Sequence, residues 1–505
     1  MILSTALSYP DWKAPADDGQ ILLWPHPSEL IRQTHENHQR LSTSQARVQN
    51  KPLAELRRSM RAWIGHASED QPLVATGHQT ELYHTGVWVK NVLIDTVAAK
   101  VNGEGYHVSV DTDEPKHLQL RWLGGSAPVT DDPNLSTAAW SGLLDAPSPA
   151  HIQEAEAAFA QDAAKWDFEP LTPEFLRSLR RLAMETPALP NAVTSASHEM
   201  EWGLGLRHHS LLASPIWMSG PFMAFVHHIL SRPAEFAHAY NHALANYRRE
   251  NKVKTPTRPM PDLTVSESVC EVPFWLDRLD VGKRQRAQVQ RIADRWVLKI
   301  DEAREFTFDP TSERAPELLL RWMRDNQVRL SPRAIPLTMF FRLFIADQFV
   351  HGIGGGRYDQ VTDRIIASFF KIEPPAFSVT TATLYFPMSV HRQRACLPCV
   401  MQQGHRLKHS LLGGEKMQLV EAISGAPRRS HERYELFQQM RQRLSAAAAG
   451  DEMLQAWRQT LDQTMQQAAE DKVLFDRELF FAVQSRERLL SMISPYRELF
   501  ELSSI

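Results

Sequence analysis

The sequence predicts an α/β protein with an open parallel sheet as its core, helical insertions, and a C-terminal antiparallel helical region of coiled-coil type. Three observations lead to this fold class. Residues 71–122 show the order strand, loop, helix, strand, which is the βαβ unit of an open α/β sheet. A glycine-rich turn at residue 352 precedes a helical pattern and then the strand pattern FSVTTATLYF at 377–386. From about residue 415 the composition changes, and proline nearly disappears after Pro427.

Hydrophobic periodicity and turn residues predict the elements in chain order. A poor pattern rich in Gly, Pro, Ser and Asp predicts a surface excursion at 123–170. The predicted elements are helices at 27–41 and 53–65, a strand at 73–75, a helix at 87–101, a strand at 106–110, helices over 172–250, short antiparallel strands over 264–310, helices over 316–350, a helix from about 357, and a strand at 377–386.

Three regions follow from this order: an N-terminal helical lead-in at 1–70, the α/β core at 71–390 with insertions at approximately 123–310, and a helical region at 391–505. Near-heptad spacing predicts long antiparallel helices beyond residue 415, with a turn near Gly450. A plain helical subdomain is the alternative. The near-heptad residues are Leu454, Trp457, Leu461, Met465 and Ala468.

Composition limits the classes of function. Hydrophobic residues make up 43% and charged residues 23% of 505 residues, and the formal net charge is −3. Because neither sign dominates, we expect no nucleic-acid or membrane partner. No basic segment followed by an apolar stretch begins at Met1, and three cysteines are too few for a disulfide scaffold. A cytoplasmic location is therefore expected.

Two Thr-Gly pairs lie between the first core strand and its helix, in VATGHQTELYHTGVWVK at 74–90. Glycines let the backbone approach a ligand, and the N–H groups of a helix start attract anions. A lysine one turn into the helix can reach a phosphate or carboxylate. Neither common phosphate-binding fingerprint fits, and a turn with capping threonines is the alternative. The predicted ligand-binding residues are Thr76, Gly77, His78, Gln79, Thr85, Gly86 and Lys90.

Acidic residues follow the second core strand in VDTDEPKH. In open α/β sheets, ligands bind beyond the carboxyl ends of the strands. Carboxylates and a histidine there can act as general bases or hold a metal. The predicted catalytic residues are Asp111, Asp113 and His117. A solvated acidic loop is the alternative.

The stretch HGIGGGRYDQVTD carries four glycines before a helix. A loop of this kind can hold an anion through backbone N–H groups, although the strict dinucleotide fingerprint fails. The predicted binding residues are Gly354, Gly355, Gly356 and Arg357, and a tightly packed turn is the alternative.

A cysteine and histidine cluster occurs in CLPCVMQQGHRLKH. Such residue types can form a tetrahedral zinc site, although the spacing is shorter than in a zinc finger. The predicted metal ligands are Cys396, Cys399, His405 and His409. Two half-buried thiols beside a basic helix start are the alternative.

Taken together, these stretches resemble the bacillithiol biosynthesis cysteine-adding enzymes, a family of cysteine ligases. The family motif VVTGQQ…L.TGP….K is similar to VATGHQTELYHTGVWVK, and its acidic motif with a closing His is similar to VSVDTDEPKH. Its region from SPN through a helix into GGPGE is similar to the stretch from LSPRAIP to GIGGGRYD, and PPAFSVTTATL resembles the strand region after it.

The resemblance implies a Rossmann-like core, a C-terminal coiled coil that supports a homodimer, and a reaction that joins the carboxyl group of cysteine to the amine of glucosaminyl-malate. On matching positions it implies roles for Thr76, Gly77, Gln79, Thr85, Gly86, Lys90, Asp111, Asp113, His117, Gly354 and Gly355. The chain departs from the family at His78, in its shorter acidic motif, and at Gly356-Arg357-Tyr358-Asp359 in place of Gly-Pro-Gly-Glu.

The sequence is compatible with three functions. The first is an amide-forming ligase in which ATP with Mg²⁺ activates the carboxylate, Lys90 and Arg357 contact phosphates, and Asp111 or His117 deprotonates the amine. The second is a metal-dependent enzyme in which His78, His84, Asp111, Asp113 and His117 bind the ion. The third is a non-catalytic assembly protein that acts through the C-terminal helices. Metal analysis separates the first two, and truncation near residue 410 tests the third.

Overall fold

A computed structural model describes residues 9–66, 68–258, 260–388 and 393–503, except for the side chain of His409. The chain forms two units, one that runs to Leu384 and resumes at Arg477, and one that spans Tyr385–Asp476. Helices hold 51% of the residues, and the mixed α/β class predicted from the sequence is confirmed. In the described part of the chain, no helix is long and apolar enough to cross a membrane.

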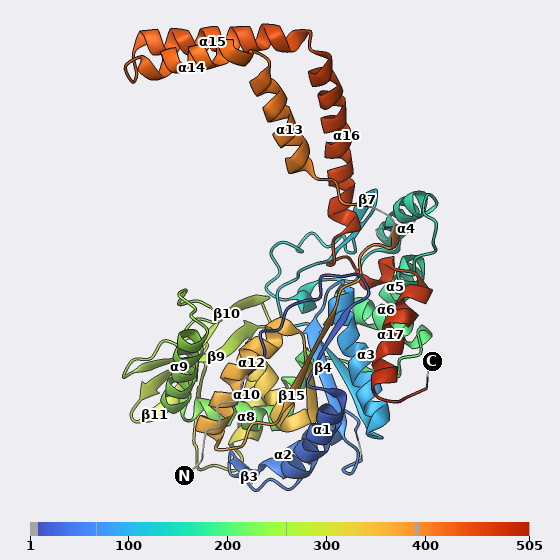
Figure 1. Ribbon diagram of the computed structural model, residues 1–505. Helices are drawn as coiled ribbons and strands as arrows, with labels where there is room; N and C mark the ends of the chain where they lie inside the picture. The colour runs from blue at the N-terminus through green and yellow to red at the C-terminus, as the bar shows by residue number, and fades with distance from the viewer. Residues whose placement is uncertain (1–8, 67, 259, 389–392, 504–505) are drawn as a thin grey trace. The chain divides into compact units, whose positions relative to one another are not determined.

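A six-stranded sheet forms the centre of the first unit (Figure 1). Its strand order is β1-β15-β14-β4-β5-β8, and every neighbouring pair is parallel except β1 with β15. The predicted mostly parallel sheet is therefore present. The strands are β1 (Ile21–Trp24), β4 (Leu73–Gln79), β5 (Glu104–Val110), β8 (His209–Leu212), β14 (Gln348–His351) and β15 (Phe377–Ala382).

Two crossovers leave the β4–β14 pair in opposite directions. Helix α3 (Thr85–Lys100) connects β4 to β5, and α12 (Ile353–Ile365) begins the connection from β14 to β15. Because parallel crossovers are right-handed, these helices lie on opposite faces of the sheet (Figure 1). The carboxyl ends of β4 and β14 therefore form a switch point in the topology, which is where open α/β sheets place ligands.

Helix α3 is buried on nearly every side, and its apolar residues are spread around the helix instead of forming one stripe. It lies between the sheet and α17 (Arg486–Leu499), whose Tyr496 hydroxyl is 2.5 Å from Thr380 Oγ1. The final segment thus belongs to the first unit, and the predicted region 391–505 is too long. The N-terminal lead-in predicted at 1–70 is likewise part of the core, because β1 pairs with β15.

A second, five-stranded antiparallel sheet has the order β12-β11-β10-β9-β13. The short antiparallel strands predicted over 264–310 are confirmed, but residues 328–332 form a strand where helix was predicted. Their buried backbone is satisfied by pairing with β9. The strands are β9 (Val269–Arg278), β10 (Lys283–Ile292), β11 (Arg295–Lys299), β12 (Glu305–Thr307) and β13 (Val328–Pro332).

The predicted surface excursion contains a helix, α4 (Pro149–Ala163). Ser148 caps it by accepting from the backbone N–H of His151, and Ile152, Ala155 and Phe159 are buried along one face. The remaining elements of this unit are α1 (Pro27–Ser42), β2 (Arg47–Val48), β3 (Lys51–Pro52), α2 (Leu53–Trp63), β6 (Gln119–Trp122), β7 (Gly125–Pro128), α5 (Thr172–Glu185), α6 (Leu189–Gly203), α7 (Ala213–Ile216), α8 (Gly220–Leu230), α9 (Pro233–Glu250), α10 (Ala315–Asp325) and α11 (Ala334–Phe340).

The second unit is helical. Helices α13 (Leu397–Ser410) and α16 (Glu452–Leu474) lie side by side, as do α14 (Gly413–Gly425) and α15 (His431–Ala449) (Figure 1). Trp457 of α16 packs over Gly404 of α13 and donates to the Val400 carbonyl at 2.7 Å. The predicted turn near Gly450 separates α15 from α16.

Candidate functional site

A cavity of about 760 Å³ opens at the carboxyl ends of β4, β5 and β14. This volume is typical of sites for small molecules. Charged, imidazole and glycine residues converge on it from both crossovers and from the second sheet. Its lining includes Gly77, His78, Gln79, His84, Gly86, Lys90, Asp113, Arg333, His351, Gly352, Gly354, Gly355, Tyr358, Arg477 and Glu478.

Two helices begin at the cavity. Helix α3 starts after His84, whose Nδ1 accepts from the backbone N–H of Gly86 at 3.0 Å, and α12 starts after Gly352. A Cβ at Gly352 or Gly354 would meet nothing within 4 Å, so the backbone there is open to a ligand. The positive ends of both helix dipoles therefore face one space, which favours an anionic group.

Two cationic side chains reinforce this preference. Lys90 is 3% exposed and donates to the Gly77 carbonyl at 2.8 Å. Arg477 donates to Thr381 Oγ1 at 3.2 Å and to the Ala382 carbonyl at 3.1 Å, and its buried Nε has no hydrogen-bond partner among the described residues. Within that part of the chain, neither cation pairs with a carboxylate, so a bound anion would satisfy both.

Gly86 makes the close approach of α3 to β15 possible. A Cβ there would lie 2.7 Å from the Ala382 carbonyl, 2.7 Å from Thr381 Oγ1 and 2.7 Å from the Arg477 guanidinium. A larger residue would therefore displace both the strand end and the cation of the cavity.

Gly86→Ala is expected to lower the free energy of unfolding by about 2 kcal/mol, because overpacked sites typically cost 1–3 kcal/mol. Urea unfolding measures the effect. The control is Gly354→Ala, which has open space for its Cβ and a helical backbone that favours alanine over glycine. Equal stabilities of the two variants would contradict the close packing of α3 on β15.

Three ionisable residues lie beside one another near the loop between β4 and α3. Burial raises the pKa of Glu81 to about 7, and burial lowers the pKa of Lys90 to about 7. Burial and the nearby Lys90 charge hold the pKa of His78 well below its ordinary value, so this imidazole is neutral. His78 Nδ1 lies 3.1 Å from Glu81 Oε1. Groups whose pKa values are shifted toward neutrality by burial are typical of acid–base sites.

Lys90→Met is expected to stabilise the protein at pH 6 by about 2–4 kcal/mol, and to do so progressively less as pH rises from 7 to 10. In this window the unfolded lysine keeps its proton while the folded one has lost it. The stability of the wild type therefore rises with pH between about pH 7 and 10. The cost of burying the charged lysine, which the substitution removes, becomes smaller over the same range. Urea unfolding at pH 6, 8 and 9.5 tests this, with Lys100→Met on the exposed end of α3 as the control. A pH-independent difference would show that Lys90 is not buried as a cation.

Nine of the residues predicted from sequence line the cavity: Gly77, His78, Gln79, His84, Gly86, Lys90, Asp113, Gly354 and Gly355. Asp113 accepts a hydrogen bond from the Gln79 amide, so the two predicted motifs do meet. Gly355 lies against His351, where a Cβ would be 2.6 Å from Nδ1.

The other predicted residues in the core have structural contacts and do not line the cavity. Thr76 donates to the Val350 carbonyl at 2.8 Å inside the sheet, and Thr85 is buried at the start of α3. Gly356 packs beneath Trp12 and Val379.

Asp111 and Arg357 are also engaged elsewhere. Asp111 accepts from the backbone N–H of Ser214 at 2.8 Å and from its hydroxyl, and burial raises the pKa of this carboxyl. Arg357 donates to the Trp12 carbonyl at 2.7 Å and lies 3.2 Å from Asp11. His117 is exposed at a left-handed backbone position, and its carbonyl accepts from Leu82. General-base roles for Asp111 and His117 therefore have no geometric support.

The two cysteines of the predicted zinc site are bonded to each other. Cys396 and Cys399 form a disulfide, whose sulfurs are not the thiolates that zinc binds. His405 is exposed on α13, and the side chain of His409 lies outside the described part of the structure. The set His78, His84, Asp111, Asp113 and His117 also forms no group with metal-binding distances among the described residues.

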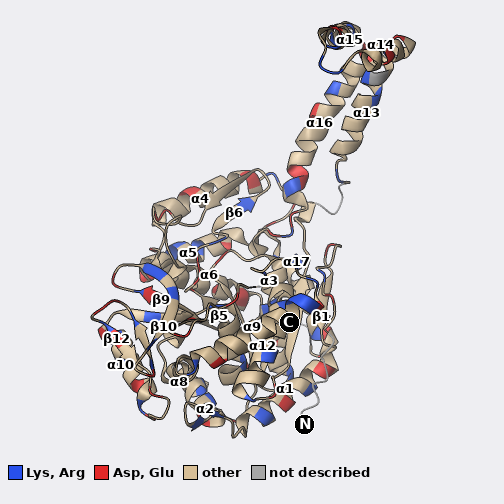
Figure 2. Cartoon of the chain, turned by 90° about the vertical axis from the view of Figure 1, so that its left-hand side faces the viewer, with Lys and Arg blue, Asp and Glu red and all other residues tan. Residues whose placement is uncertain are grey.

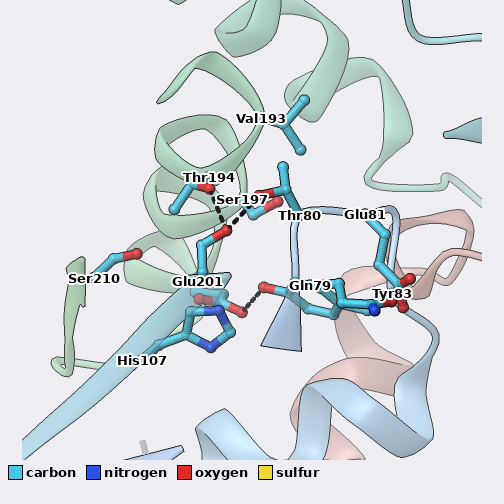
Figure 3. A pocket seen from close by; sticks show the side chains of 11 residues that line it. Gln79, Thr80, Glu81, Tyr83, His107, Val193, Thr194, Ser197, Glu201 and Ser210 are labelled. Carbon is cyan, nitrogen blue, oxygen red and sulfur yellow. Dashed lines mark hydrogen bonds between the residues drawn. The ribbon is translucent and has the colours of Figure 1, made fainter. Parts of the chain in front are cut away.

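A second, smaller cavity of about 10 Å³ lies behind Gln79, which lines both cavities. Figure 3 shows the Tyr83 hydroxyl directed at Glu201, a bond of 2.8 Å, with His107 beside it. Burial and the Glu201 carboxylate hold the pKa of Tyr83 well above its ordinary value. This polar network fixes the loop that carries the residues of the main cavity.

Sequence patterns missed several cavity residues because they are far from the motifs. Arg477 and Arg333 come from the final segment and from the second sheet, and only the fold brings them to Lys90. The sequence did contain a signal for His351, because this residue directly precedes the glycines of HGIGGG at the end of β14.

No known protein family matches this chain, and no curated protein is significantly similar to it. The functional assignment therefore depends on the site itself.

Proposed function

We propose that this cavity is the active site of an amide-forming ligase, which joins the carboxyl group of an amino acid of the cysteine type to the amine of a small amino-sugar conjugate. The observation that carries the proposal is that two helix N-termini and two cations, Lys90 and Arg477, converge on one space at the switch point. Among the described residues, neither cation forms an ion pair with a carboxylate. Both substrates of such a reaction carry anionic groups that this surface would bind.

The topology supports a Rossmann-like core for this enzyme. The parallel strands are, in chain order, β4, β5, β8, β14 and β15. Numbered first to fifth in that order, they are arranged 3-2-1-4-5 across the sheet, and the cavity lies at the junction of the first and the fourth, β4 and β14. This is the arrangement in which nucleotides bind at the switch point. The open glycines at the start of α12 suit the phosphates of ATP with Mg²⁺, the proposed source of energy for carboxylate activation.

A protonated amine is not nucleophilic, so the reaction needs a group that accepts its proton. We assign this role to His351, which lines the cavity. His351 Nε2 lies 2.6 Å from Asp359 Oδ2, and the carboxylate of Asp359 is held in turn by Arg342 at 2.9 Å and by Thr338 at 2.7 Å. Burial raises the pKa of Asp359, but the adjacent charge of Arg342 and the hydrogen bonds from His351 and Thr338 outweigh it and keep this pKa below its ordinary value.

An ionised Asp359 accepts the Nε2 proton of His351, which leaves Nδ1 as the basic nitrogen. Nδ1 lies toward Gly355 at the start of α12, where the anionic groups are expected. In the coupling step the amine nitrogen forms a bond to the activated carbonyl carbon, the activating group departs with its electron pair, and the amine proton passes to Nδ1. His351 is thus the base, and Asp359 is a positioning residue.

Both signs of charge are interspersed over the side of the chain drawn in Figure 2. This distribution favours small polar substrates over a nucleic acid or a membrane surface, as the net charge of −3 suggests.

The function is tested by incubating the pure protein with cysteine, glucosaminyl-malate and MgATP, followed by mass spectrometry. The expected product has the summed mass of the two substrates less one water, and its formation requires ATP. Absence of product with these substrates and with other amino acids at saturating concentration would contradict the ligase assignment.

We also propose that the helical unit associates two chains as a coiled-coil homodimer. Large apolar side chains are exposed along its helices, namely Met401, Met417, Val420, Tyr434, Phe437, Met453 and Met465. Exposed apolar patches of this kind mark interaction surfaces.

Light scattering at 10 µM is expected to give about twice the chain mass of 57.6 kDa. The double variant Met417→Glu with Tyr434→Glu is expected to be monomeric, because it places charges on an apolar contact. The matched control carries Glu at Met184, which is equally exposed but lies on α5. A wild-type mass of one chain would contradict the dimer.

A further inference from the structure

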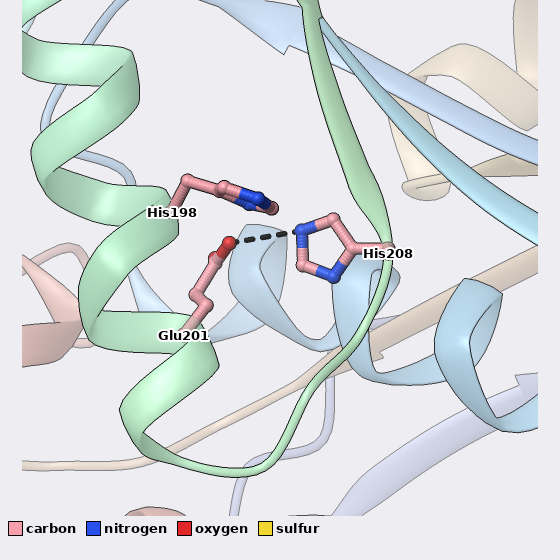
Figure 4. A group of neighbouring side chains, drawn as sticks. All are labelled: His198, Glu201 and His208. Carbon is pink, nitrogen blue, oxygen red and sulfur yellow. Dashed lines mark ion pairs between the residues drawn. The ribbon is translucent and has the colours of Figure 1, made fainter. Parts of the chain in front are cut away.

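Three metal-binding side chains meet behind the main cavity. His198 and Glu201 are separated by three positions on α6 and therefore share one face of the helix. His208 follows on the segment between α6 and β8, after the reversal at Gly205. One potential ligand atom from each residue lies within 4.8 Å of the others, and Figure 4 shows the three side chains directed at one point.

Three ring nitrogens of the two histidines make no hydrogen bond among the described residues. His208 is 2% exposed, and neither of its ring nitrogens has a hydrogen-bond partner among the described residues; the same holds for Nδ1 of His198. His208 Nε2 is 3.0 Å from Glu201 Oε2, but without hydrogen-bond geometry. Buried polar atoms are nearly always paired, so these orphaned nitrogens call for a partner that is not a protein atom.

The carboxylate is already oriented for such a partner. Glu201 Oε1 accepts from the Tyr83 hydroxyl at 2.8 Å and from Asn91 Nδ2 at 2.8 Å. The other oxygen, Oε2, faces His208. Asn91 is fixed in turn by His107 Nδ1 at 2.7 Å. Outer contacts of this kind hold first ligands in place at metal sites.

We propose that His198, Glu201 and His208 bind a divalent transition-metal ion of the zinc type. Two imidazoles and one carboxylate suit Zn²⁺ and disfavour Mg²⁺ or Ca²⁺, which prefer oxygen ligands throughout. Zinc sites with three protein ligands leave a fourth position for a water molecule. The ion would join α6 to the segment before β8 and, through Tyr83 and Asn91, fix the loop that forms a wall of the main cavity.

This site is separate from the zinc cluster predicted at the C-terminal cysteines, and it does not depend on the ligase reaction. The sequence contains a signal for it, since HEME at 198–201 provides His-x-x-Glu on a helix and a third ligand follows at 208. The spacing has no strict motif, so only the fold identifies the set.

The test uses the full-length, untagged protein, incubated with ZnCl₂, dialysed and analysed for metal by mass spectrometry. About one equivalent of zinc per chain is expected for wild type. His208→Asn and His198→Asn are expected to raise the Kd for Zn²⁺ at least 100-fold, whereas His209→Asn, an exposed neighbour of the set, retains wild-type affinity.

A second readout protects the test against variants that fail to fold. Removal of the ion from wild type with a chelator is expected to lower the Tm, and Zn²⁺ is expected to restore it. Co²⁺ bound by wild type is expected to give visible ligand-field absorption that is lost in His208→Asn. Less than 0.1 equivalent of zinc on wild type, or equal zinc contents in wild type and both ligand variants, would overturn the proposal.

Discussion

Asp347→Asn is expected to lower the free energy of unfolding by about 3–5 kcal/mol. Asp347 is fully buried and accepts from Arg57 at 2.7 Å, from Arg61 at 2.5 Å and from the backbone N–H of Leu73 at 2.8 Å, at the start of β4. Removing its charge leaves two buried guanidinium groups uncompensated, and breaking a buried pair in this way is among the most costly single changes.

Urea unfolding measures this effect. Asp294→Asn is the matched control, because Asp294 pairs with Arg291 on an exposed turn and such pairs contribute little. Burial alone would raise the pKa of Asp347, but the contacts with His38, Arg57 and Arg61 outweigh it and hold this pKa well below its usual range. The stabilisation is therefore complete above about pH 4 and declines as pH falls below that value. A loss below 1 kcal/mol would show that the buried network does not anchor β4 to β14.

His351→Gln is expected to lower kcat for amide formation by 10²–10⁴, the usual contribution of a general base. The glutamine amide can still donate to Asp359, so the fold is retained while the proton acceptor is lost.

His26→Gln is the control for this prediction, because His26 is an exposed residue before α1. Asp359→Asn is expected to lower the rate as well, because it removes the carboxylate that orients His351. A change of less than fivefold in His351→Gln would transfer the role of base to another group in the cavity.

Local patterns predicted the core of the fold because its signals are local. The βαβ unit at 71–122 and the strand at 377–382 are short, apolar and bounded by turn residues. The strand at 328–332 was missed because its stability comes from pairing with β9, and α17 was assigned to the wrong region because only tertiary packing on α3 brings it back. Contacts between distant segments cannot be inferred from periodicity.

The difference between local and long-range signals also explains which residues of the site were predicted. His78, Gln79 and Asp113 were predicted because they lie at or just beyond strand ends, where topology alone places ligands, and Lys90 because it lies in the first turns of the helix that follows. Asp111 follows the same rule but is bound by Ser214, a partner that no sequence pattern indicated. Arg477 and the set His198, Glu201 and His208 depend on the folded chain.

Isothermal titration of glucosaminyl-malate into wild type and Arg477→Met tests most directly the claim that the switch-point cavity binds an anionic substrate. We expect one ligand per chain, an affinity at least tenfold weaker in Arg477→Met, which corresponds to about 1.4 kcal/mol, and no change in the control Lys100→Met on α3. Equal affinities in wild type and Arg477→Met, or no binding by either, would contradict the account.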